Sequence, residues 1–159
     1  MTNNDELFEN LVKLGQHPKS KVDSVTVMEK IGHFLDDAVH KIYRDLKKEG
    51  YNKQEASPLI EKRLKISKVL KKASKKWDGG YAMAGLLGHG DAFVLRDPSA
   101  IRPAYFFKND EVAVVASERP AIQTVFNTKY EDIQELEAGH SIIIKKSGKA
   151  STVPILEQR

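Results

Sequence analysis

Cysteine is absent from this sequence of 159 residues, and long apolar runs are absent as well. Without cysteine the chain holds no disulfide, no thiolate metal site and no cysteine nucleophile. No apolar run approaches the roughly 20 residues of a membrane-spanning helix, and the polar start MTNNDELFEN differs from a secretory signal or a transit peptide. We therefore expect a soluble, cytoplasmic protein with no membrane contact, of a length suited to one domain.

Acidic residues are absent between Lys62 and Lys76, where much of the formal net charge of +4 originates. The favoured interpretation is the solvated face of an amphipathic helix. The alternative is a stand-alone, non-enzymatic module that binds anions or nucleic acid through this basic helix face. Recognition of single strands would need aromatic side chains among the lysines, and the nearby Trp77 falls on the apolar side of the pattern. A nucleic-acid partner is therefore the less favoured expectation.

The first half of the chain, residues 1–78, has the spacing of helices. A short helix places Leu7, Leu11 and Leu14 on one side. Thr2 or Asn3 can cap this helix, and Gly15 ends it.

Two further helices follow in this half. The longer covers residues 25–48, with Asp23 or Ser24 as its cap and Gly50 at its end. Its apolar positions are Ile31, Leu35, Ala38, Ile42 and Leu46. The third begins near Ser57 and Pro58 and continues as one helix to the region of Trp77. Its apolar positions are Ile60, Leu64, Leu70, Ala73 and Trp77.

The second half, residues 79–159, has short β-rich runs between turn residues, and the change falls at Asp78-Gly79-Gly80. The expected strands are 81–87, 92–96, 104–107, 112–116, 140–145 and 151–155. We expect the first four to form an antiparallel meander, with hairpin connections at His89-Gly90-Asp91 and Lys108-Asn109-Asp110. A short helix is expected at 118–126, and the last two strands are expected to join around Ser147-Gly148. The sequence thus predicts an α+β fold in a single domain over 1–159, with residues 1–78 mainly helical and 79–159 mainly antiparallel strands.

Isolated motifs give little evidence of chemistry. Gly85, Gly88 and Gly90 resemble a phosphate-binding loop, but no helix follows them, so a hairpin turn is favoured. His33 and His40 lie on one face of the long helix without the spacing of a metal site, and we expect no metal.

Three segments in the second half, FVLRDPSAIRP, VVASERPAIQTVF and ELEAGHSIIIKKSG, carry a family resemblance. In this order and spacing they are similar to the glutaminase domain of amidophosphoribosyltransferases, which start purine synthesis from glutamine and phosphoribosyl pyrophosphate (PRPP). The start of the chain at Thr2-Asn3-Asn4 resembles the stretch after the family's Asn-Gly motif, so the resemblance spans the whole chain. It implies a partial N-terminal-nucleophile hydrolase fold, an αββα sandwich.

The resemblance also implies what lies outside these residues. In this family an N-terminal cysteine attacks the glutamine amide, and the Asn-Gly pair stabilises the oxyanion. Both are expected upstream of Met1, so we predict no catalytic residue in this chain and no activity for it alone. A phosphoribosyltransferase domain, which binds Mg with PRPP, is expected downstream as a partner, and no cofactor is expected here. Open sheet edges favour a homo-oligomer.

Asp23 is the one substrate-binding residue that the resemblance implies. In the family an aspartate followed by serine or threonine, just before the long helix, pairs with the α-amino group of glutamine, and Asp23-Ser24 matches it best. The alternative is that Asp23 only caps the helix. A rival hydrolase with Thr2 as N-terminal nucleophile would need a strand after Thr2, where the sequence predicts a helix.

Two turns in the family segments are expected to be structural. Arg96 or Arg102 can pair with Asp97 or bind backbone carbonyls. The family usually has glycine where Ala100 stands, so alanine argues against a left-handed turn there. Ser117 is expected to cap the short helix.

Overall fold

The computed structural model describes residues 1–159, and the chain forms two compact units, Met1–Asp78 and Gly79–Arg159. We call them the helical unit and the sheet unit. The mixture of helices and antiparallel sheet confirms the predicted α+β class. No helix combines the length and apolar character that a membrane span requires. The assignment of both units to a single domain stays a prediction.

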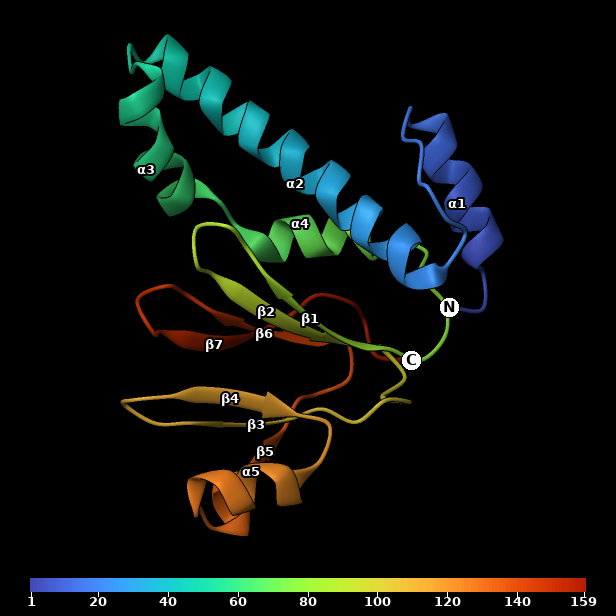
Figure 1. The fold of residues 1–159 in the computed structure, drawn as a ribbon, viewed down its shortest axis with the longest axis vertical. Coiled ribbons are helices and arrows are strands. Elements are labelled where there is room, and N and C mark those ends of the chain that lie inside the picture. Colours follow the sequence, from blue (N-terminus) through green and yellow to red (C-terminus); the bar gives the residue numbers. More distant parts are fainter. The chain divides into compact units, whose positions relative to one another are not determined.

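The helical unit contains α1 (Asn4–Lys13), α2 (Asp23–Lys48), α3 (Lys53–Arg63) and α4 (Ile66–Ala73), shown in Figure 1. The long helix α2 packs against each of the other three. The core side chains of the helical unit are Leu7, Leu11, Leu46, Leu70 and Trp77, all fully or almost fully buried. Of the predicted stripe on α2, only Leu46 is fully buried, and the four other positions are half-buried.

Helix α1 differs from its prediction at both ends. Leu14 is the residue after the helix and is 47% exposed, so its expected burial was wrong. Gly15, with φ of +80°, ends the turn as expected. Asn3 stands at the N-cap position, but its side chain makes no cap hydrogen bond because it binds the backbone of residues 76 and 78 instead.

The single helix expected from Ser57 onward was wrong, because the structure has two helices there. Helix α3 starts earlier, where the Asn52 side chain accepts hydrogen bonds from Gln54 N and Glu55 N while Glu55 accepts one from Asn52 N. Helix α3 therefore begins with a capping box and carries Pro58 inside it. The backbone then extends at Leu64 before α4 begins, and Leu64 and Leu70 are both buried.

The sheet unit has two antiparallel sheets. One has the order β1-β2-β6-β7 and the other β4-β3-β5. The strands are β1 (Ala82–Leu86), β2 (Ala92–Arg96), β3 (Tyr105–Lys108), β4 (Ala113–Ala116), β5 (Gln134–Glu135), β6 (His140–Ile144) and β7 (Ala150–Pro154). The helix α5 (Arg119–Phe126) lies against β3 and β4, and a 3-10 turn, η1 (Tyr130–Asp132), precedes β5.

The expected meander was wrong at the step from β2 to β3. The two strands lie in different sheets, and β2 pairs instead with β6, with Val94 opposite Ile142. The three hairpin connections behave as predicted: Gly90 has φ of +105° in the first, and the Asn109 side chain accepts two backbone hydrogen bonds in the second. The inner faces of the sheets enclose a core of Ala104, Phe106, Leu136 and Ile142.

Candidate functional site

Asp23 lies in the first turn of α2 with its carboxylate exposed to solvent. The N-cap position is Val22, whose side chain cannot cap, so the expected cap by Asp23 or Ser24 was wrong. The Asp23 carboxylate instead accepts a hydrogen bond of 2.9 Å from the α-ammonium group of Met1. This hydrogen bond and the positive charge of the ammonium lower the pKa of Asp23. The start of α2, where the helix dipole is positive, therefore holds an ionised carboxylate paired with an α-ammonium group.

Residues 1–3 are held in place by the chain at 76–78. Thr2 N donates to Asp78 O at 3.1 Å, and the Thr2 hydroxyl donates to the Asp78 carboxylate. The Asn3 amide donates to Lys76 O at 2.8 Å and accepts from Asp78 N. Thr2 leads directly into α1, as predicted, and not into a strand. These bonds fix the segment that brings an α-ammonium group to Asp23.

Lys30 is a buried cation two turns further along α2. It is 7% exposed, its ammonium group donates to Lys75 O at 2.9 Å, and it lies 5.9 Å from the centre of the Trp77 ring. Burial lowers its pKa to about 8, with a further contribution from the positive charge of Lys76. About 10 Å of helix separates it from Asp23, so the two do not form one site.

Arg96 and Asp97 organise the turn between the two sheets. The Asp97 carboxylate accepts hydrogen bonds from Ser99 N, Ile101 N and Arg102 N at 3.0 Å, and from Tyr81 N at 3.3 Å. The Arg96 guanidinium donates to three backbone carbonyls, those of Ala100, Arg102 and Leu136, and to the Glu135 carboxylate. Arg96 thus binds carbonyls as expected, but it does not pair with Asp97.

Ala100 occupies a left-handed conformation in this turn, with φ of +51°. The expectation that alanine would exclude such a conformation was wrong. The bonds from residues on both sides of Ala100 to Asp97, and the bond from Arg96 to its carbonyl, impose it. The expected cap of α5 by Ser117 was also wrong, because Glu118 stands at the N-cap position and no side chain caps the helix.

A second buried carboxylate, Asp91, lies at the far end of the β1-β2 hairpin. It is 2% exposed, binds the Lys145 ammonium, accepts from Lys146 N at 2.9 Å, and lies 3.0 Å from Nε2 of His89. Burial alone would raise the pKa of Asp91. The hydrogen bonds from Lys145, Lys146 N and His89 outweigh this effect and lower the pKa to about 2. The cluster joins the β1-β2 and β6-β7 hairpins.

An apolar cleft of about 370 Å³ is lined mainly by β1 and β2, with one residue each from β4 and β6. Its lining is apolar throughout: Ala84, Gly85, Leu86, Ala92, Phe93, Val94, Val115 and Ile144. Leu86 is 79% exposed there. Strands β1 and β4 each also have one edge without a partner strand, where backbone groups remain available for pairing.

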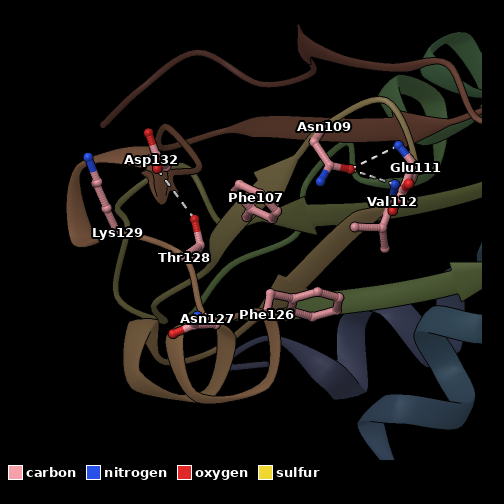
Figure 2. Close-up of a pocket in the computed structure, with 9 residues that line it drawn as sticks. All are labelled: Phe107, Asn109, Glu111, Val112, Phe126, Asn127, Thr128, Lys129 and Asp132. Atoms are coloured by element: carbon pink, nitrogen blue, oxygen red, sulfur yellow. Dashed lines mark hydrogen bonds between the residues drawn. The ribbon is translucent and has the colours of Figure 1, made fainter.

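A larger, open pocket of about 610 Å³ lies between the β3-β4 turn and the end of α5. Figure 2 shows Phe107 and Phe126 in it, and their ring centres are 6.3 Å apart. Glu111 and Asp132 bring carboxylates to its rim and Lys129 brings an ammonium group. These opposite charges favour no single class of ligand. No three His, Cys, Asp or Glu side chains gather anywhere in the structure to hold a metal ion.

Comparison with known proteins gives a fold relationship. No protein-family model and no curated protein match the chain. A solved glutamine PRPP amidotransferase from B. subtilis, complexed with ADP and GMP, matches with a TM-score of 0.65 and 20% identity over 97% of this chain. The chain shares its fold with part of a PRPP amidotransferase.

A second solved structure, described as the allosteric regulatory enzyme of purine biosynthesis, matches 74% of the chain with 22% identity and a TM-score of 0.50. The chain covers 27% of the first solved chain and 26% of the second. It therefore spans about a quarter of the length of each.

Sequence reasoning missed two of the groups described above. The Asp91 cluster depends on residues 54 positions apart, and no local motif indicates it. The burial of Lys30 was also missed. The helical periodicity could have indicated it, because Lys30 follows the buried Val27 by one turn on the same side of α2.

Proposed function

We propose that the chain is an internal part of the class II glutaminase domain of an amidophosphoribosyltransferase, with an N-terminal-nucleophile hydrolase fold. Such an enzyme converts glutamine and PRPP to phosphoribosylamine, the first step of de novo purine biosynthesis. The observation that carries the proposal is the fold likeness to a PRPP amidotransferase over 97% of the chain. The three family segments support it, since they form β2 with the Asp97 turn, β4 with α5, and β5 with β6.

In this proposal Asp23 binds the α-amino group of glutamine. The structure leaves the Asp23 carboxylate exposed at the start of α2, where the amino group of a ligand can reach it. A carboxylate is ionised at neutral pH, as pairing with an ammonium group requires.

The chain alone is proposed to be inactive. It has no cysteine, and the N-terminal cysteine and the Asn-Gly oxyanion motif would be supplied by residues upstream. The open edges of β1 and β4 support this, because strands supplied by upstream residues could pair with them. A downstream phosphoribosyltransferase domain would bind Mg with PRPP. The complete enzyme is proposed to be cytoplasmic and homo-oligomeric.

The role of Asp23 is tested in a protein extended upstream to the expected N-terminal cysteine. Loss of a charge-assisted hydrogen bond in Asp23→Asn should raise the KM for glutamine roughly 10- to 100-fold with little change in kcat. Asp45→Asn, which removes an exposed carboxylate from the same helix, is the matched control. An unchanged KM in Asp23→Asn, or an equal rise in both variants, would contradict the assignment.

A further inference from the structure

Seven exposed lysines lie within one segment of the helical unit, residues 62–76, which we call the basic face: Lys62, Lys65, Lys68, Lys71, Lys72, Lys75 and Lys76. With Arg63 they give eight basic residues and no acidic one between positions 62 and 76, whereas the rest of the chain has 18 basic and 22 acidic residues. The positive charge of the chain is therefore local to this face, and the remainder is net negative.

No acidic side chain of the chain neutralises this face. None of the seven lysines takes part in an ion pair, and only Arg63 does, with Glu49 at 2.7 Å. Lys71 and Lys72 lie in the last turn of α4, where they also interact favourably with the helix dipole. That interaction involves only two of the seven lysines, so the face still attracts anions strongly.

The basic face is also held rigidly. The opposite side of α4 is buried through Ile66, Val69, Leu70 and Ala73. The helix break at Leu64 makes α4 a separate short helix whose charged side is fixed by this burial. The three lysines of α4, Lys68, Lys71 and Lys72, thus project from a helix whose other side is fixed in the core.

We propose that the basic face binds the phosphate backbone of duplex nucleic acid without sequence preference. Lysine ammonium groups act as point charges toward phosphates, and the face has no glutamine, asparagine or further arginine to read bases. The adjacent aromatic residue, Trp77, is 1% exposed. It therefore offers no stacking surface to the bases of a single strand.

Other partners fit this face less well. Protein interfaces are depleted in lysine and depend on aromatic or arginine anchors. Here Trp77 is buried, and the one arginine, Arg63, already pairs with Glu49. A membrane-surface helix inserts its apolar side into lipid, but the apolar side of α4 is buried within the protein. The phosphate backbone of a duplex needs neither feature.

The size of the face sets the expected salt dependence. The eight residues of α4 extend about 12 Å, along which a duplex carries about seven phosphate charges. If about four phosphates are neutralised, the logarithm of the binding constant should fall with the logarithm of salt concentration at a slope of about −3.6. The dissociation constant should be on the order of micromolar to 100 µM at physiological salt.

The test uses fluorescence anisotropy of the full chain with labelled 20-base-pair duplexes of RNA and of DNA, and with the corresponding single strands, over roughly 50 to 200 mM KCl. The proposal predicts binding to at least one duplex that exceeds binding to the single strands. A difference in affinity between the RNA duplex and the DNA duplex would show that the geometry of the phosphate backbone affects binding. Equal or tighter binding of the single strands would overturn the proposal.

Two triple variants with equal net charge locate the contact. Lys68→Gln/Lys71→Gln/Lys72→Gln should reduce the salt slope by about 2.7 and weaken duplex binding at least 10-fold at low salt. The control removes three exposed lysines from α2, Lys41→Gln/Lys47→Gln/Lys48→Gln, and should change the slope by less than about one. Circular dichroism confirms that both fold. An equal effect of the two triples would show general charge attraction and overturn the assignment. Neither arm depends on glutamine, so the result is independent of the proposed glutaminase function.

Discussion

Substitution of Ala100 by glycine should stabilise the sheet unit. Ala100 has φ of +51°, a conformation that costs an L-residue about 1 to 2 kcal/mol and costs glycine almost nothing. Glycine also gives the unfolded chain more conformational freedom, and this offsets about 0.4 to 1 kcal/mol of the stabilisation. The Ala100 backbone bonds, from its N to Asp97 O and from Arg96 to its O, do not involve its methyl group. The free energy of unfolding should therefore rise by about 0.5 to 1 kcal/mol.

Urea unfolding followed by circular dichroism measures this change, with an unchanged dependence on urea concentration expected. The matched control is Ala121→Gly, at an exposed position within α5, which should lower the free energy of unfolding by up to about 1 kcal/mol. The opposite signs of the two effects are the test. Destabilisation by Ala100→Gly of the size seen in the control would refute the left-handed conformation and the Asp97 turn built around it.

Three further outcomes are expected. Arg96→Met should lower the free energy of unfolding by about 3 to 5 kcal/mol, since three carbonyls and Glu135 lose a buried partner; a loss below 1 kcal/mol in urea unfolding would contradict this. Asp91 has a pKa of about 2 against an ordinary 3.8, so its pairing should contribute about 2 kcal/mol above pH 4 and lose this as the pH falls from 4 to 2. The stability difference between the native chain and Asp91→Asn should shrink over that interval, and a constant difference would refute the pairing with Lys145. The uncovered cleft predicts self-association of the chain, reduced by Leu86→Ser; a strictly monomeric native chain in sedimentation velocity would contradict it.

The sequence predicted features that depend on neighbouring residues. Strand β2 has the predicted bounds, and the turns at Gly90 and Asn109 form as expected, because hairpin geometry is set by the turn residues themselves. The capping box at Asn52 and Glu55 is equally local and could have been found from its spacing.

Features that depend on distant residues were not predicted. The pairing of β2 with β6 brings together residues as distant as Val94 and Ile142, and the Asp97 turn needs donors spread from Tyr81 to Arg102. Ala100 shows the same effect, since several hydrogen bonds impose a conformation that its own propensity disfavours. The substrate role of Asp23 came from the family resemblance and stays a proposal.

The central claim, that this chain is part of a glutaminase domain, is tested most directly by ammonia release from glutamine. The chain is compared with a version extended upstream to the expected N-terminal cysteine. The account predicts ammonia from the extended protein only. Activity of the chain itself, which has no cysteine, would contradict the account and point to Thr2, and absence of activity in a folded extended protein would contradict it as well.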